Sequence, residues 1–336
     1  MRTRHFVVPI ALASVICGSR FLNAAGQKEA PCTIILSANV VVPDGRLVRD
    51  LSASQFVAEC RHKPVKVMAA TQDSGKRRIL LILETGPDVP EKVRRAEYSI
   101  VADVLAEARP EDSFGLLTAG GPEKKVAFGQ SHDAILAAAK ELETNTDSKA
   151  RGNGVLDAIM AGAGWFDEPG LGDAILLMST GLQNEHHASF KQVRKELADR
   201  QVRIFSLLFA PRMLGTITGP TIGFSQGRTE LIFDQTYLPN KEDEDSLSWG
   251  SGGYSMQVDI VGGGQHDQGV TDQKLEALKT AASRMQSAMT EYYRVTVDSY
   301  PGQITLRLAS DLKNKVPNAV VIYPTQLPPC RVTRNP

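Results

Sequence analysis

"RRILLILETGPDV", residues 77 to 89, joins a short apolar run to an acidic turn that contains Gly-Pro. The run from Ile79 to Leu83 is bounded by charge on one side and by Gly86 and Pro87 on the other. This pattern is typical of a strand that is buried on both faces of a parallel sheet. Ligands of such sheets bind beyond the carboxyl ends of the strands. The turn that follows Leu83 is therefore the first place to look for a functional site.

The start of the chain has the pattern of a secretory signal peptide, which we place at residues 1–25. Arg2, Arg4 and His5 precede an apolar stretch at 6–17, and the small residues of "NAAGQ" follow it. A membrane anchor is the alternative, but an anchor needs about 20 apolar residues and this stretch is shorter. No later segment is apolar enough to span a membrane. The sequence thus predicts an exported protein, periplasmic, cell-surface or secreted, with no transmembrane segment in the mature chain.

The composition narrows the class of partner. The 38 basic residues, Lys and Arg, balance the 38 acidic ones, Asp and Glu. A protein that binds nucleic acid nonspecifically needs a basic excess, so we expect no nucleic-acid partner. With 336 residues the chain is long enough for a large core and two domains.

The apolar spacing in the middle of the chain predicts alternating strands and helices, and hence a doubly wound, mostly parallel α/β sheet covered on both faces. We assign this domain to 76–292. It is inserted between β segments at 26–75 and 293–336, which we expect to pack together as a small β-sandwich. One stretch, 211–250, is rich in Gly, Pro and Thr and is predicted to be a long loop. The expected strands are 78–84, 113–118, 124–128, 173–179, 202–209 and 253–258, and the expected helices are 90–108, 131–143, 153–166, 187–200 and 271–292.

Five motifs follow one another along the chain: "VVVPDGRLVRDLSASQFVAECRHKPVKV", "GNGVLDAI", "AILLMSTG", "SGGY" and "MTEYYRVTVDSY". Together they resemble the von Willebrand factor type A family, in particular its exported bacterial members, in which such a domain lies between β segments. The resemblance covers most of the mature chain. It implies the von Willebrand A-like fold and a role in binding another protein.

Members of that family hold a magnesium ion where a strand ends in Asp-x-Ser-x-Ser, with a Thr from a second loop and an Asp from a third. The corresponding positions here are Glu84, Gly86 and Asp88, then Asn153, then Thr180, so no position keeps the family's residue. Magnesium needs near-ideal octahedral contacts at about 2.1 Å, which the longer Glu84 and the loss of both serines disfavour. We therefore expect a degenerate site that binds no metal and no cofactor. The alternative is a Mg²⁺-dependent adhesion module that uses these altered ligands.

The sequence carries no motif that is typical of an enzyme. The cluster "NEHHAS", residues 184–189, lacks the two-histidine spacing of a helical zinc site and is expected to form a polar loop before a helix. The chain has no Gly-x-Ser-x-Gly elbow and no Gly-rich phosphate-binding loop. We therefore predict a non-enzymatic interaction module, for adhesion or as a scaffold.

The protein partner is expected at the carboxyl ends of the parallel strands, where loops form the available surface. The β-sandwich is the alternative surface, because loop position is only a general guide to function. The residues that we expect to contact the partner are Asp88, Leu182, Asn184 and Glu185.

Three cysteines remain in the mature chain, Cys32, Cys60 and Cys330, and an oxidising compartment allows one disulfide and one thiol. The expected strand directions put all three at the end of the sandwich remote from the inserted domain. A disulfide needs Cα atoms within about 7 Å. Cys32 with Cys60 is the first choice, and a bond to Cys330 is the alternative.

Overall fold

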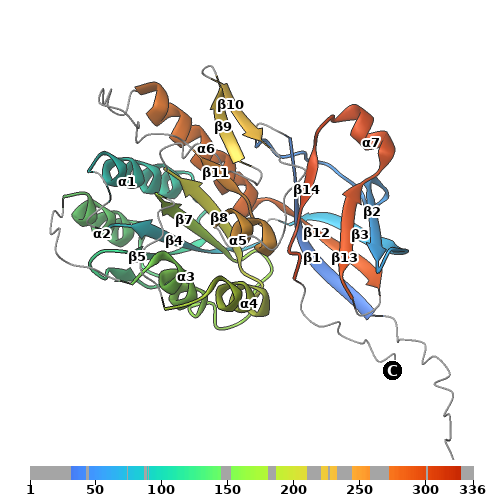
Figure 1. Cartoon of the computed structure of the whole chain (residues 1–336), viewed down its shortest axis with the longest axis horizontal. Helices are drawn as coiled ribbons and strands as arrows, with labels where there is room; N and C mark the ends of the chain where they lie inside the picture. The colour runs from blue at the N-terminus through green and yellow to red at the C-terminus, as the bar shows by residue number, and fades with distance from the viewer. Residues whose placement is uncertain are drawn as a thin grey trace, which may run out of the picture.

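The computed structural model has two six-stranded sheets, one of them mostly parallel, with helices packed on that sheet (Figure 1). The prediction of a mixed α/β protein with a mostly parallel sheet is therefore confirmed. No helix in the part of the chain that the structure describes is long and apolar enough to cross a membrane. The described residues are 32–42, 45–73, 75–86, 89, 91–144, 153–180, 187–209, 221–225, 228–232, 244–257, 272–299 and 302–326.

The parallel sheet is built around the strand β4, the apolar run with which the sequence analysis begins. Its residues Ile79, Leu80, Leu81 and Ile82 are 0 % exposed, because helices cover both faces of the sheet. Only the edge strand β6 pairs in the antiparallel direction. In spatial order the strands are β11 (Ser255–Gln257), β8 (Arg203–Leu208), β7 (Ala174–Ser179), β4 (Arg78–Glu84), β5 (Ser113–Ala119) and β6 (Lys125–Val126).

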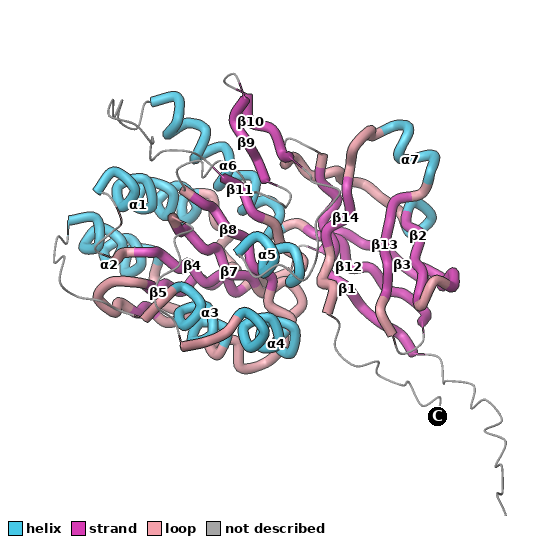
Figure 2. The backbone as a smooth tube through the Cα atoms, in the orientation of Figure 1, coloured by secondary structure: helices cyan, strands magenta, loops and turns pink. Residues whose placement is uncertain are grey.

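Alternate side chains of β4 enter two separate cores. Ile79, Leu81 and Leu83 belong to the core that contains residues of α1, α2 and α6, whereas Leu80 and Ile82 belong to the core that contains residues of α3, α4 and α5. Figure 2 shows these two groups of helices on either side of the sheet. This alternation follows from the two-residue period of a strand. The helices are α1 (Glu91–Ala106), α2 (His132–Thr144), α3 (Val155–Ala163), α4 (Phe190–Arg200), α5 (Glu244–Ser251) and α6 (Asp272–Thr290).

Each predicted strand and helix of this domain is present, with ends that differ by no more than a few residues. The prediction of a loop over 211–250 is wrong for the described part of that stretch. It contains the hairpin of β9 (Thr221–Ser225) and β10 (Arg228–Ile232), and it ends in α5. Leu247 of α5 is buried in the second core, a tertiary contact that the local composition does not reveal.

The second sheet joins strands from both ends of the chain. The terminal β segments form one antiparallel sheet rather than two stacked ones, and its edge strands β13 and β14 approach each other. The Tyr323 hydroxyl, just after β14, accepts a hydrogen bond of 3.0 Å from the Leu306 N–H of β13. In spatial order the strands are β13 (Ile304–Leu308), β2 (Phe56–Cys60), β3 (Lys63–Asp73), β12 (Tyr292–Ser299), β1 (Cys32–Val41) and β14 (Val320–Ile322); the short helices η1 (Ala53–Gln55) and α7 (Ser310–Lys315) lie between strands.

A buried arginine joins the two sheets. Arg203, at the start of β8, is 0 % exposed, and its guanidinium lies 4.5 Å from the centre of the Tyr292 ring. Burial lowers the pKa of Arg203 to about 10, so it remains a cation at neutral pH. Two of its nitrogens donate to acceptors from the turn before β7, from α6 and from the second sheet, while Nε has no hydrogen-bond partner in the described part of the chain. These acceptors are Gly172 O (3.2 Å), Ala288 O (3.2 Å), Met289 O (2.8 Å) and Asn39 Oδ1 (3.1 Å).

The cysteines require a correction. The strand registers put Cys32 and Cys60 at the same end of the second sheet, away from Asp73 and Tyr292 where it joins the first. Cys60 is nevertheless a buried thiol outside any disulfide, so the predicted bond between Cys32 and Cys60 is not formed. The physical reason is that β3 and β12 separate their strands in the sheet. Cys330 lies outside the described residues, and its bond to Cys32 stays a prediction for non-reducing peptide mapping.

Candidate functional site

The candidate site lies at the carboxyl ends of β4, β5 and β7, where three chain segments meet. Glu84 ends β4, Asn153 precedes α3, and Thr180 follows β7. Parallel strands end at the same edge of their sheet, which is why residues so far apart in the sequence come together here. The predicted positions Glu84, Gly86, Asn153 and Thr180 all lie at this edge. Asp88, Leu182, Asn184 and Glu185 lie outside the described residues.

Glu84 binds the chain that leaves β7. Its side chain is almost completely buried, and its Oε2 accepts three hydrogen bonds. The donors are the Ser179 hydroxyl at 2.9 Å, the Thr180 backbone N–H at 2.7 Å and the Thr180 hydroxyl at 2.9 Å. Charge-assisted hydrogen bonds of this kind are stronger than neutral ones. The carboxylate therefore connects the carboxyl ends of β4 and β7, the two central strands of the sheet.

A second buried acid, Glu97 of α1, lies close to Glu84. Burial raises the pKa of Glu97 well above its usual value, and the neighbouring negative charge of Glu84 raises it further. The Glu84 backbone N–H and the Arg94 cation oppose this shift without cancelling it. In the described part of the chain, Glu97 Oε1 has no hydrogen-bond partner although it is buried. The site thus pairs a hydrogen-bonded carboxylate with an acid whose pKa is raised by burial and by the neighbouring charge.

Glycines bring the loops after β4 and β5 into direct backbone contact. A Cβ atom on Gly86 would lie 3.1 Å from Gly120 O, and one on Gly121 would lie 2.3 Å from Thr85 O. Gly120 has φ +75°, a conformation that favours glycine. Its N–H donates to Asn153 O at 2.6 Å, which ties the third loop to the other two. Asn153 therefore contributes through its backbone, while its side chain is exposed.

Asp157, in the first turn of α3, is a residue of this edge that sequence analysis missed. Its carboxylate accepts from the backbone N–H groups of His187 (3.0 Å) and Ala188 (2.7 Å), and it lies 3.2 Å from His187 Nδ1. Burial alone would raise the pKa of Asp157, but these donors outweigh it and lower the pKa. Asp157 thereby fixes the start of the segment that leads into α4. The motif "GNGVLDAI" contains Asp157, but its partners lie 30 residues away and could not be read locally.

The donor set at this edge gives little support for a resident metal ion. Within the described ranges, no group of three or more His, Cys, Asp or Glu side chains is placed to hold one. A metal ion would need both Glu84 Oε2 and the Thr180 hydroxyl as ligands, but the hydroxyl donates a hydrogen bond to that Glu84 oxygen. Gly86 offers no side-chain oxygen.

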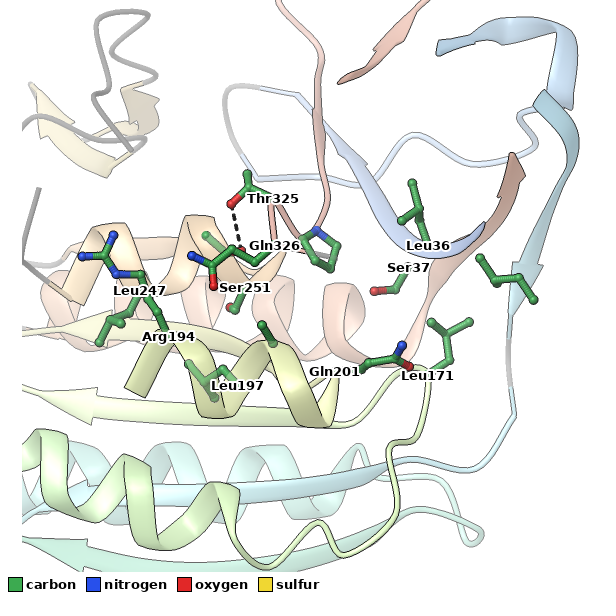
Figure 3. A pocket seen from close by; sticks show the side chains of 14 residues that line it. Leu36, Ser37, Leu171, Arg194, Leu197, Gln201, Leu247, Ser251, Thr325 and Gln326 are labelled. Atoms are coloured by element: carbon green, nitrogen blue, oxygen red, sulfur yellow. Dashed lines mark hydrogen bonds between the residues drawn. The ribbon is translucent and has the colours of Figure 1, made fainter. Parts of the chain in front are cut away.

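A separate crevice lies between the two sheets, bounded by β1, α4 and α5 (Figure 3). Leu36, Leu171, Leu197 and Leu247 give it an apolar wall. Its volume is ≈ 50 Å³, far below the 300–1,000 Å³ that is usual for ligand sites. The crevice can hold no more than a small group.

No protein-family model matches the chain, and no curated protein matches it. Three solved structures with some similarity are an aerotolerance-related membrane protein from Bacteroides fragilis, BatB from Bacteroides thetaiotaomicron and the VWA domain of SpRpn10. Their identities to the chain are 12 %, 15 % and 14 %, and the TM-scores are 0.38, 0.35 and 0.32. The matches cover 62 %, 62 % and 41 % of this chain and 99 %, 98 % and 77 % of those chains. Similarity at this level assigns neither a family nor a function.

Proposed function

We propose that the chain is an exported, non-enzymatic interaction protein of the von Willebrand A type, which binds a protein partner through the carboxyl-end face of its parallel sheet and without a metal ion. The observation that carries this proposal is the set of three hydrogen bonds to Glu84 Oε2. The carboxylate at the first position of the family's metal motif is already engaged inside the protein.

Two further features support a face that works without metal. A Cβ atom on Gly86 would lie 3.1 Å from Gly120 O, so a serine at the second motif position would require the Gly120 backbone to move by a few tenths of an ångström. The bond from the Gly120 N–H to Asn153 O, and the bond from the Ala188 N–H to the Asp157 carboxylate, already join loops that a metal ion would otherwise bridge. A rigid set of loops is the usual basis for a binding surface of this kind.

The second candidate function is a Mg²⁺-dependent adhesion module with altered ligands. The observation in its favour is that Glu84, Asn153 and Thr180 do lie at one edge of the sheet. Export, in both cases, rests on the signal-like pattern of residues 1–25. The non-enzymatic character rests on the absence of catalytic motifs from the sequence.

The test is partner capture from the exported fraction, with the mature protein as bait and with either EDTA or Mg²⁺ present. The face variant is Asp88→Lys combined with Leu182→Asp. The control variant is Met68→Asp, which changes a side chain that is 52 % exposed on β3 of the other sheet. We expect a specific partner that is captured equally in EDTA and in Mg²⁺, retained by the control and lost by the face variant.

Each other outcome has a defined meaning. Capture that requires Mg²⁺ would favour the metal-dependent alternative. A face variant that melts at the wild-type temperature and keeps every specific partner would overturn the proposed face, and loss of the partner by Met68→Asp would move the contact to the other sheet.

A further inference from the structure

The strand β1 has one edge that β14 covers only in part. On one side β1 pairs with β12 from Cys32 to Ala38, and on the other side it pairs with β14 from Asn39 to Val41. Among the described residues, no strand lies beside 33–38 on the β14 side. An edge of this kind presents backbone N–H and C=O groups with which another strand can pair, so proteins usually cover it.

The chain after β14 continues in the direction that would cover this edge. β14 is antiparallel to β1, with Asn39 opposite Ile322. The same register puts Gln326 beside Ile35. This placement agrees with the structure, because Gln326 and Ile35 both line the crevice of Figure 3. The last described residues therefore already follow β1.

The point from which the remaining C-terminal residues start is fixed. The Thr325 N–H donates to Gly250 O at 3.1 Å, and the Thr325 hydroxyl donates to the same oxygen at 3.2 Å. Gly250 belongs to α5 of the inserted domain. The next turn packs closely as well, since a Cβ atom on Gly252 would lie 2.6 Å from Pro324 Cδ. The segment thus leaves from a bonded position between the two sheets.

The cysteines define where the segment ends. Cys32, at the far end of the same edge, is disulfide-bonded, whereas Cys60 is a buried thiol outside any disulfide. Beyond the predicted signal peptide the chain has one further cysteine, Cys330. The four residues from Gln326 to Cys330 span up to about 14 Å, and the three strand residues from Ile35 back to Cys32 span about 10 Å. Cys330 can therefore come within the Cα separation of about 7 Å that a disulfide requires.

We propose that residues 327–330 run antiparallel along the edge of β1 and that a disulfide between Cys330 and Cys32 holds them there. Pro328 and Pro329 suit this position, because prolines occur in edge strands and their carbonyl oxygens can still accept from β1. The segment closes the edge of β1. It also ties the terminal sheet to α5, to which its first residues are bonded.

The disulfide makes this cover depend on the redox state. The bond forms by exchange with the disulfide of a thiol oxidant: the thiols of Cys32 and Cys330 lose two protons and two electrons, and the disulfide of the oxidant becomes two thiols. Reduction reverses the exchange and releases the segment, which opens the edge of β1. The proposal goes beyond the partner-binding function and does not depend on it, because this edge belongs to the terminal sheet.

The test is peptide-resolved amide hydrogen exchange of the full mature protein, before and after reduction with a phosphine. Successive residues of an antiparallel strand direct their N–H groups to opposite sides, so about half of the amides at 33–38 face this edge. We expect these amides to exchange about tenfold faster, or more, after reduction. The amides at 293–297 of β12 should not change, because β12 lies between β1 and β3.

Variants identify the segment that protects the edge. Cys330→Ser, and a chain that ends at Gln326, should exchange at 33–38 as the reduced wild type does, without any reductant. Cys60→Ala is the matched control, since Cys60 is outside any disulfide, and it should keep the wild-type exchange. Non-reducing peptide mapping of the wild type should find Cys32 joined to Cys330. Should the shortened chain fold poorly, Cys330→Ser and the reduced wild type give the same comparison.

Three results would overturn the proposal. The first is a peptide map in which Cys32 is not joined to Cys330. The second is equal exchange at 33–38 in the oxidised wild type, the reduced wild type and the shortened chain, which would show that the segment does not cover the edge. The third is protection of 33–38 only in a protein with the solution mass of a dimer, which would make a second copy of the chain the occupant.

Discussion

At the amino end of the parallel sheet, Arg203 is buried with four hydrogen-bond acceptors and an aromatic ring around its guanidinium. At the carboxyl end, Glu84 is equally buried and well bonded, yet the neighbouring Glu97 keeps an oxygen that has no partner in the described part of the chain. Arg203 Nε likewise has no hydrogen-bond partner in that part of the chain, so the two ends differ in another way: oxygen atoms surround the Arg203 cation, whereas Glu97 lies beside a second acid.

This difference separates a polar cluster that stabilises its buried charge from one that disfavours it. Oxygen atoms around a buried cation favour its charged form, whereas burial beside a second acid disfavours the ionised form of a carboxyl group. Arg203 joins the C-terminal carbonyls of α6 to the first strand of the chain, so it holds the two sheets together. The Glu84 and Glu97 pair lies at the carboxyl ends of the parallel strands, and there the arrangement of the buried groups is less favourable.

The largest loss of stability is expected for a substitution of Arg203, which lies at the junction of the two sheets. Arg203→Met would leave four acceptors without their donor, and a loss of about 3–5 kcal/mol in the free energy of unfolding is expected for a broken buried polar cluster. Urea unfolding of both proteins measures it. Arg307→Met, which removes a half-exposed ion pair, is the control and should change stability by less than about 1 kcal/mol. A similar small loss for Arg203→Met would show that the junction is not what stabilises the contact between the sheets.

A smaller loss is expected for Thr180→Asp at the carboxyl end. The substitution replaces a hydroxyl that donates to Glu84 with a second carboxylate, so like charges meet in a buried site. We expect a loss of about 2–3 kcal/mol in EDTA, the cost of an unsatisfied buried group, and no recovery in millimolar Mg²⁺. Thr180→Ser keeps the hydroxyl and is the control. Recovery of the melting temperature by Mg²⁺ would mean that this edge still binds metal.

The smallest effect on stability is expected for Glu97, and it appears as a dependence of the free energy of unfolding on pH. The folded state keeps a proton on Glu97 that the unfolded state releases near pH 4.3, so the contribution of Glu97 is favourable at low pH and is lost as pH rises towards its folded pKa. Glu97→Gln should remove this loss of stability with rising pH and should raise the free energy of unfolding at pH 7 by about 1 kcal/mol. Glu276→Gln, at an exposed position of α6, is the control. Identical pH profiles for Glu97→Gln and the wild type would contradict the neutral state of Glu97.

Much of the inserted domain could be predicted from local patterns. β4 occupies the predicted residues 78–84, because an all-apolar run between turn signals has few alternatives. α5 and the hairpin of β9 and β10 were missed, since their stretch is rich in Gly, Pro and Thr and α5 buries Leu247 in a core whose other residues are distant in the sequence. The arrangement of the terminal strands in one sheet was missed as well, because strand partners far apart in sequence leave no local signal.

The sequence by itself determined the α/β alternation and the edge of the sheet at which Glu84, Asn153 and Thr180 gather. These follow from periodicity and from the parallel direction of the strands. Only the tertiary structure decided what these residues and their neighbours do. Glu84 forms a hydrogen bond with Thr180 across 96 positions of sequence, the pKa of Glu97 is raised because the residue is buried beside that carboxylate, and two strands separate the strand of Cys60 from the strand of Cys32. Hydrogen bonding, burial and distance depend on packing, and packing is a property of the folded chain.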